Sequence, residues 1–311
     1  MSNVLVNSLP QYVEQNGDKL LKKAILGAET AQRFTLQTGV KTQTALNLLN
    51  TDVQFQDGKS CGFNAAGSQT ISQRTITAGV IKVDMEWCDR VLLDSCAQHQ
   101  VRIAAGQRTM PFEEQFVSDI IDNINLKVDK LIWQGDTTKT TDAALKWTDG
   151  LIKILNANDG ITVASQKLEH AAITKSNVCG IVDDVVLAIP TAVLNVSTIY
   201  MGYDTFRLWR MALAGANLYH ESGDGLDRPR AFYPGTNIEV KPVAGLDGTS
   251  TIVSGVDKYF YYGVGDMDNE SSTFDLWFSK DNGTFRFDCE FAVGTQAAFP
   301  NQCVISNLDT D

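Results

Sequence analysis

The sequence feature that most constrains the fold is a long stretch, residues 51–87, that favours extended strands but contains few large apolar side chains. Over 69–77 nearly every residue is Gln, Thr, Ser or Arg, and Ile71 and Ile76 are the exceptions. Threonine and isoleucine favour strands, yet a strand this polar cannot lie in the core of its own domain. The glycine-containing segment 57–67 precedes it and would form a loose tip. The stretch therefore predicts a long β-hairpin that protrudes.

The C-terminal end of this stretch alternates regularly between apolar and charged residues. Four apolar side chains would point to one side of a strand: Ile81, Val83, Met85 and Trp87. Three charged side chains would point to the other side: Lys82, Asp84 and Glu86. A two-stranded hairpin is only marginally stable by itself in water, so it must rest on another surface, and a neighbouring copy of the chain is the simplest partner. We expect the apolar set to anchor the hairpin base, and the charged set, with Arg74, to contact neighbouring copies.

A second constraint is a long amphipathic helix predicted over residues 110–134. Apolar side chains recur at every fourth position: Phe112, Phe116, Ile120, Ile124, Val128 and Ile132. This spacing places them on one face of a helix, and Gly135 follows as a stop. At ~1.5 Å per residue the helix would be roughly 36 Å long. We expect its apolar face to pack on a sheet of its own domain.

The remainder of the chain mixes helices and strands, which predicts an α+β fold. Residues 178–188 have the pattern of a helix, and Asp204 can begin another. The clearest strand near the C-terminus alternates over Phe285, Phe287, Cys289, Phe291 and Val293. No apolar run approaches the ~20 residues that a membrane helix needs, and no signal peptide opens the chain. We therefore expect a protein of the cytoplasm with no membrane partner.

The charge and the cysteines exclude several classes of function. The chain carries 26 Lys and Arg against 37 Asp and Glu, a formal net charge of −11. A nucleic-acid groove needs clustered positive charge, so we expect no sequence-specific DNA binding. The six cysteines include no C-x-x-C pair, which argues against a zinc site. They are expected to be reduced thiols, mostly in the core.

Partial matches to catalytic motifs fail at their essential positions. Gly-Lys-Ser at 58–60 resembles the end of a phosphate-binding loop, but Val53 stands where that motif needs its first glycine. His-Glu at 220–221 resembles the start of a zinc-protease motif, but Asp224 replaces the second histidine. We therefore predict no catalytic residue, no cofactor and no metal ion, and a structural protein that is not an enzyme.

Several segments carry a family resemblance through their order along the chain. They are Trp133-Gln134-Gly135-Asp136 followed by Asp149-Gly150-Leu151-Ile152, then Ser197 to Met201 with Phe206 and Leu208, then Tyr219 to Val240, and last Phe285 to Val304. This order, after an arm and a long polar hairpin, resembles that of the major capsid protein of tailed bacteriophages, which has the HK97-like fold.

The resemblance implies a division of the chain and a mode of assembly. The parts would be an N-terminal arm at 1–50, an extended loop at 51–90, a peripheral domain at 91–149 and 256–290 with a spine helix at 110–134, and an axial domain at 150–255 and 291–311. Hexamers and pentamers of the chain would form an icosahedral shell around double-stranded DNA. The shell would assemble in the cytoplasm of a host bacterium and become part of the virion.

The resemblance also implies further partners. The arm is too short to hold the cleaved scaffolding segment of some family members, so a separate scaffolding protein is expected, together with a portal protein and, in some shells, decoration proteins. Lys59 and Lys82 lie where some members cross-link covalently through a hairpin lysine. No matching partner is identifiable, so we expect ordinary solvated lysines here.

Three other functions stay open at the level of sequence. An encapsulin-like nanocompartment shell would carry an enzyme cargo instead of DNA. A tail or baseplate component would form rings or tubes. An enzyme of unknown type would show a deep pocket with convergent titratable groups.

Overall fold

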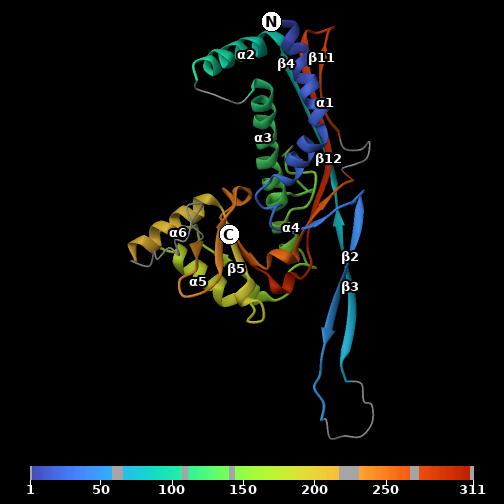
Figure 1. Ribbon diagram of the computed structural model, residues 1–311. Helices are drawn as coiled ribbons and strands as arrows, with labels where there is room; N and C mark the ends of the chain where they lie inside the picture. Colours follow the sequence, from blue (N-terminus) through green and yellow to red (C-terminus); the bar gives the residue numbers. More distant parts are fainter. Residues whose placement is uncertain are drawn as a thin grey trace.

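The computed structural model describes residues 2–57, 66–106, 111–139, 144–216, 231–266 and 273–308. Two sheets with their helices form the body, and a two-stranded ribbon projects from it (Figure 1). None of the helices within these ranges combines the length and apolar content that crossing a membrane requires.

The first sheet is built around one long strand, β12 (Thr284–Ala297). Its outer neighbours on one side are β11 (Thr273–Ser279) and β10 (Phe260–Val264), and β1 (Thr35–Gln37) pairs in parallel with β10. On the other side β12 pairs with β4 (Gly79–Cys88). The predicted alternation on β12 is confirmed, because its apolar set is buried: Phe285, Phe287, Cys289, Phe291 and Val293.

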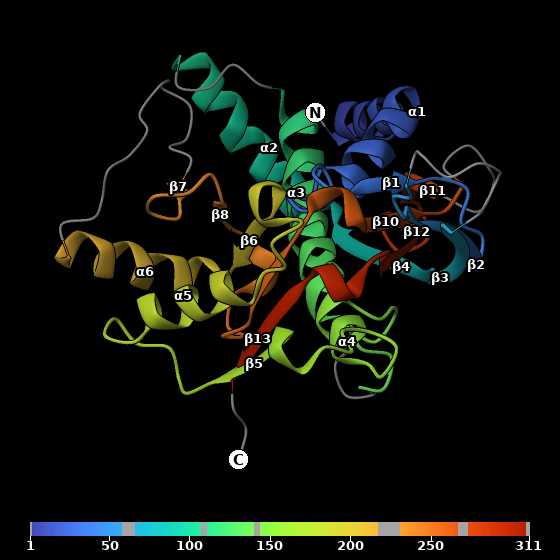
Figure 2. The same ribbon diagram turned by 90° about the horizontal axis from the view of Figure 1, so that it is seen from below.

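Helix α3 (Phe112–Gln134) confirms the predicted long helix and lies between the two sheets (Figure 2). Its buried residues form the expected face: Val117, Ile120, Ile121, Ile124, Val128, Leu131, Ile132 and Trp133, with Asp129 among them. Helix α1 (Ser2–Leu26) packs against α3 and β11, and α2 (Asp89–Ala104) follows β4. The predicted arm is therefore largely a helix that belongs to the core of the first sheet.

The end of α3 is fixed by a close approach of two glycines. The amide of Gly150 donates to the carbonyl of Gly135 at 2.8 Å. A Cβ on Gly135 would lie 2.4 Å from the carbonyl oxygen of Thr148, and a Cβ on Gly150 would lie 2.6 Å from that of Trp133. No larger residue fits either position, so the chain can turn here into α4 (Leu151–Asn156) only with glycine at both.

The second sheet has its own core. Its strand order is β5 (Lys167–His170), β13 (Val304–Leu308), β9 (Ile252–Gly255), β6 (Thr198–Met201), β8 (Glu239–Pro242) and β7 (Ala231–Phe232). Helices α5 (Val178–Ala188) and α6 (Tyr203–Gly215) pack together beside it (Figure 2). Short 3-10 turns lie at Ala164–Gln166, Leu194–Val196, Ala244–Leu246, Asp257–Tyr259 and Pro300–Gln302.

These boundaries differ from those implied by the family resemblance. Residues 291–297, expected in the axial domain, continue β12 in the first sheet. Residues 151–161, also expected there, contribute Leu151, Leu155 and Ile161 to the core around α3. The reason is that β12 is longer than its alternating segment, and it bridges from β11 to β10 without a break.

The ribbon consists of β2 (Gln43–Asp52) and β3 (Ser68–Thr77). They pair antiparallel from Gln43 with Thr77 to Asp52 with Ser68. The predicted loop, 51–90, was wrong at both ends: the ribbon begins at Gln43, inside the predicted arm, and β4 does not belong to it. The long extended run 68–88 is real, but it has two partners, β2 for its first half and β12 for its second.

Candidate assembly surfaces

The base of the ribbon is packed on the body through one face. Leu46, Leu48 and Ile76 are buried there in a small core with Val40 and Ala298. Arg74, on the same face, donates to the carbonyl of Asp159 at 2.8 Å and lies 3.6 Å from its carboxylate. These contacts hold the root of the ribbon against its own chain, so its direction is set by the body.

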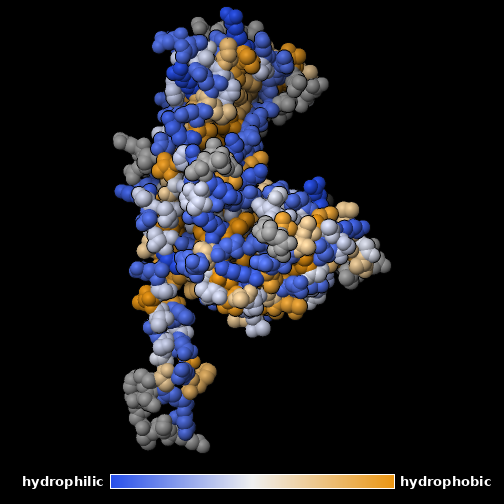
Figure 3. All heavy atoms as spheres, turned by 180° about the vertical axis from the view of Figure 1, so that it is seen from behind, coloured by the Kyte–Doolittle hydropathy of each residue, from blue (hydrophilic) through white to orange (hydrophobic). Residues whose placement is uncertain are grey.

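The distal half of the ribbon has no such support. Leu49 and Ile71 are direct cross-strand partners and are 56% and 72% exposed. Side chains alternate along a strand, so this pair lies on the face opposite to Leu46 and Leu48. Beyond it, Val53 is 69% and Phe55 is 99% exposed. The rear view shows a mostly hydrophilic ribbon with a few scattered hydrophobic groups (Figure 3).

The apolar residues predicted to anchor the hairpin base lie on β4, inside the first sheet. Ile81, Val83 and Trp87 are half-buried against the main core, and Met85 is 40% exposed. Their partners in the register are apolar as well, because Ile81 lies opposite Phe291 and Trp87 opposite Phe285. The Trp87 ring also contacts that of Phe116, with centroids 5.0 Å apart. These four side chains therefore anchor β4 at an edge of the first sheet. We had expected them to anchor the base of the hairpin.

The charged residues predicted to contact neighbours have partners within the chain. Lys82 lies 3.2 Å from Asp84 and 3.6 Å from Asp288, and its hydrogen bond to Asp84 raises the pKa of Lys82. Glu86 accepts from Thr284 at 2.7 Å and from Arg286 at 3.1 Å, and these bonds lower the pKa of Glu86. Arg74 lies apart from them on the ribbon. Their contact with a neighbouring copy stays a prediction.

An apolar trough runs between α3 and β4, with a volume of about 720 Å³. We call it the α3–β4 trough. Its apolar lining comes from both elements and from β12: Ile81, Val83, Met85, Trp87, Phe116, Ile120, Ile124, Val128, Leu131 and Phe291. The contact between Trp87 and Phe116 bounds one end, and Ala144 and Trp147 line the other. Apolar surface is visible between polar rows on the upper part of the body in Figure 3.

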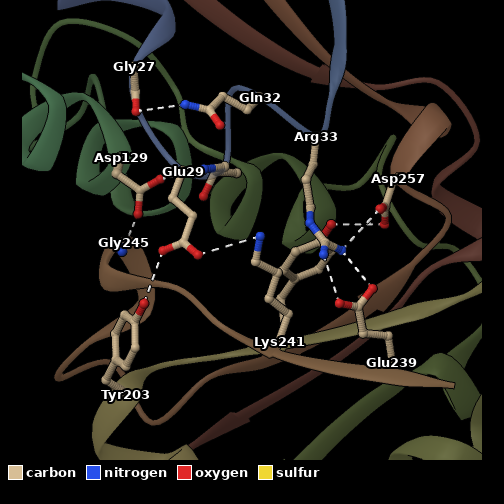
Figure 4. A network of polar contacts seen from close by, with 12 residues as sticks. Gly27, Glu29, Gln32, Arg33, Asp129, Tyr203, Glu239, Lys241, Gly245 and Asp257 are labelled. Atoms are coloured by element: carbon tan, nitrogen blue, oxygen red, sulfur yellow. Dashed lines mark hydrogen bonds and ion pairs between the residues drawn. The ribbon is translucent and has the colours of Figure 1, made fainter. Parts of the chain in front are cut away.

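A polar junction joins the segment after α1 to α3 and to the second sheet (Figure 4). Arg33 forms two hydrogen bonds with the carboxylate of Glu239 on β8, at 2.9 and 2.7 Å, and lies 3.5 Å from Asp257. The bond to Glu239 raises the pKa of Arg33. Nearby, Glu29 accepts from the Tyr203 hydroxyl at 3.0 Å and lies 3.5 Å from Lys241. No periodic pattern in the sequence marked these residues.

Asp129 is the buried centre of this junction. Its carboxylate accepts from the amide of Thr30 at 3.1 Å and from the amide of Gly245 at 2.6 Å. The indole of Trp133 donates to the Thr30 hydroxyl at 2.9 Å. Burial raises the pKa of Asp129, and the two amide hydrogen bonds act in the opposite direction. One carboxylate on α3 thus satisfies backbone groups from both flanking segments.

The described residues with catalytic potential include no group arranged as a metal centre. Within the described ranges, no group of three or more His, Cys, Asp or Glu side chains is arranged to hold a metal ion. Burial raises the pKa of Cys289 and of Cys303 to about 12, so these thiols stay protonated. The Gly-Lys-Ser tip at 58–60, the His-Glu pair at 220–221 and Asp224 lie outside the described residues.

Comparison with known proteins identifies the fold. No protein-family model matches the sequence, and no curated protein matches it. A chain of the satellite phage P4 procapsid with its size determination protein aligns over 95% of this chain and 91% of its own, with a TM-score of 0.60 and 8% identity. A capsid chain of an empty GTA particle aligns over 92% and 89%, with a TM-score of 0.53 and 16% identity.

A third solved structure agrees. A chain from Gordonia phage Cozz aligns over 91% of this chain and 86% of its own, with a TM-score of 0.54 and 9% identity. Each likeness extends over both sheets, since it covers nine-tenths or more of the sequence. The chain therefore has the HK97-like fold of bacteriophage capsid proteins.

Proposed function

We propose that this chain is the major capsid protein of a tailed bacteriophage, the subunit that assembles into an icosahedral shell around double-stranded DNA. The observation that carries the proposal is the ribbon. Its base is buried against its own chain, while its distal half is exposed on both faces. A two-stranded ribbon gains little stability by itself in water. A neighbouring copy that covers the distal half would stabilise the ribbon.

The mechanism is assembly through many repeated contacts. The first sheet with α1, α2 and α3 would act as the peripheral domain, and the second sheet with α5 and α6 as the axial domain near the centre of each capsomer. Individual contacts in such a lattice can be modest, because interfaces on the order of 1,600 Å² that close into rings add up to a stable particle. Hexamers and pentamers are the rings that an icosahedral shell requires.

The charge of the chain suits a container for DNA. A net charge of −11 disfavours tight binding to phosphates. The shell would therefore enclose the packaged DNA without binding its bases or its phosphate backbone tightly. The virion is the corresponding location, after assembly in the cytoplasm of the host bacterium. A separate scaffolding protein, a portal protein and, in some shells, decoration proteins would be the partners. None of these roles requires catalysis.

Electron microscopy of the expressed chain tests the proposal. The wild-type chain, alone or with its scaffolding protein, should form closed shells that sediment as large particles. Tubes or open rings would instead indicate a tail or baseplate component. Particles purified from infected cells should contain double-stranded DNA, and particles that hold an enzyme cargo without DNA would indicate a nanocompartment. A chain that stays monomeric under all these conditions would overturn the proposal.

A further inference from the structure

A second pocket, with a volume of about 320 Å³, lies in the second sheet between β5, β13 and α5. We call it the β5–α5 pocket. Strand β5 is at the end of the strand order, so the pocket opens at an edge of this sheet. Its volume is near the lower end of the range for sites that enclose small ligands. None of the assembly surfaces described above includes it.

The strand register explains which side chains meet in the pocket. Leu168 on β5 lies opposite Ser306 on β13, and His170 follows Leu168 by two residues. Side chains alternate along a strand, so these three lie on one face of the sheet. Helix α5 lies beside both strands (Figure 2). It contributes Ile181 and Asp184, which are three positions apart and therefore share one face of the helix.

Two buried polar atoms of these side chains lack a hydrogen-bond partner among the residues that the structure describes. They are Nε2 of His170, a residue that is 9% exposed, and Oγ of Ser306, which is 1% exposed. Nδ1 of His170 lies 2.8 Å from the carbonyl oxygen of Ala171. A carbonyl only accepts, so Nδ1 carries the proton and Nε2 of the neutral ring is an acceptor. An unpaired buried acceptor lowers stability, so this site lacks a donor.

The charges around the pocket are all negative. Glu169 and Asp184 line it and are exposed. No ion pair or side-chain hydrogen bond joins either carboxylate to another described residue, and no lysine or arginine of the described ranges lines the pocket. An anion is therefore disfavoured. A metal ion is disfavoured too, because no three His, Cys, Asp or Glu side chains in the described part of the chain are arranged to hold one.

We propose that the β5–α5 pocket binds an alkylammonium group. An ammonium has three donors and no acceptor, which matches a site that offers acceptors and negative charge. It donates to the carboxylates of Glu169 and Asp184 and supplies the donor that His170 lacks. The methylenes of the ligand lie against Leu168 and Ile181. This binding site does not depend on the proposed shell function.

Two sources share this chemistry: a free diamine, and a lysine side chain of a second polypeptide. Isothermal titration calorimetry of the full chain with 1,4-diaminobutane and with N-acetyl-lysine methylamide distinguishes them. We expect saturable binding of at least one amine and none of 1,4-butanediol, which has a similar shape and no charge. Tighter binding of the diamine assigns the site to a free diamine, and tighter binding of the lysine derivative assigns it to a polypeptide. If neither amine binds saturably, the inference is overturned.

A pair of neighbouring aspartates provides the matched control. Asp184→Asn should weaken binding of the preferred amine at least fivefold, because it removes a carboxylate that lines the pocket. Asp183→Asn removes the same charge one residue away, where the carboxylate accepts from the Tyr233 hydroxyl at 2.8 Å and does not line the pocket. It should weaken binding less than twofold. Equal effects of the two variants would mean that the amine responds only to net charge, and would overturn the inference.

Ser306→Ala separates a binding role from a structural one. The substitution removes a buried hydroxyl that has no partner among the described residues. The ligand-free chain should therefore unfold at the same urea concentration as wild type or at a higher one. Binding of the amine should weaken at least threefold, because the ligand loses an acceptor. Unchanged affinity, or a lower urea midpoint of the ligand-free variant, would overturn the inference.

Discussion

Arg33, in the segment after α1, holds the carboxylate of Glu239 on β8 through two hydrogen bonds of 2.9 and 2.7 Å, across 206 residues of sequence. The first residue belongs with the core of the first sheet and the second with the other sheet. This pair, with Asp257 and the buried Asp129, fixes the N-terminal segment to both halves of the body. The orientation of the two sheets thus depends on a few polar contacts as well as on α3.

Replacing Arg33 should loosen this junction. Arg33→Ala removes a two-point charged contact in which both side chains are about a quarter exposed, and we expect a loss of about 1–2 kcal/mol in the free energy of unfolding. Arg33→Lys should lose less of the free energy of unfolding, because lysine keeps the positive charge. It should still lose some, because lysine lacks the planar guanidinium group. Urea denaturation of the unassembled chain measures both. Equal stability of wild type and Arg33→Ala would contradict the role given to this pair.

Replacing Asp129 should lower the free energy of unfolding more than replacing Arg33 does. Asp129→Ala leaves the buried amides of Thr30 and Gly245 without an acceptor, and we expect a loss of about 2–4 kcal/mol. Asp129→Asn keeps one acceptor oxygen and should lose about half as much. The measurement is the shift in urea midpoint at constant slope. If the alanine variant unfolds within about 0.5 kcal/mol of wild type, other groups satisfy these amides.

The ribbon should show a sharp boundary between base and distal half. Ile76→Ala removes a fully buried side chain and should cost about 2–4 kcal/mol. Ile71→Ala, only five residues away, should change the stability of the unassembled chain by less than about 0.5 kcal/mol, because its side chain is 72% exposed. Thermal unfolding of the two variants compares them directly. Similar losses in both would show that the distal half is also packed on its own chain.

Trp87→Ala should weaken the first sheet. The Trp87 ring contacts Phe116 at 5.0 Å and Phe287 at 6.5 Å between centroids. Losing it should cost about 2–3 kcal/mol and lower the yield of shells in a sedimentation assay. Trp87→Phe, which keeps a ring, is the matched control and should recover most of the yield. Normal particles from Trp87→Ala would remove this residue from the set that supports assembly.

The turn after α3 should depend on pH. Lys153 lies 2.7 Å from Asp136 and 2.6 Å from Asp149, and its hydrogen bond lowers the pKa of Asp136. A carboxylate with a lowered folded-state pKa adds stability above its unfolded value, near ~3.9, and loses it as the pH falls further. Lys153→Met should therefore be less stable than wild type at pH 7, and the difference should shrink below about pH 4.

The exposed Lys175 supplies the control for that experiment. Lys175→Met removes a lysine of equal charge from the surface and should leave stability unchanged at both pH values. A gap between wild type and Lys153→Met that is independent of pH would mean that the methylenes of Lys153, and not its charge, stabilise the turn.

Periodic patterns predicted individual elements well. The four-residue repeat from Phe112 to Ile132 located α3, and the alternation from Phe285 to Val293 located β12. Both patterns are local, because the buried face of one helix or strand can be recognised from a short continuous stretch of sequence. The glycines at 135 and 150 were noticed as part of a family resemblance, and their physical reason is the contact between their backbones.

The pairing of strands with one another could not be predicted in the same way. The alternation over Ile81 to Trp87 indicates a strand with one apolar face, but β12 and the second strand of a hairpin are equally suitable partners for it. The polar run before it was correctly expected to protrude. The junction was missed because Arg33, Asp129 and Glu239 are far apart in sequence and follow no period. Only the folded arrangement of both sheets brings them together.

The uninterrupted run from Ser68 to Cys88 has a mechanical consequence. The ribbon continues through Ala78 directly into β4, which is paired with β12 from Gly79 to Cys88. A force that pulls the ribbon along its axis loads all the backbone hydrogen bonds between β4 and β12 together, in shear. The bonds are therefore not broken one after another. In the proposed shell, the subunit would therefore bear tension along this run.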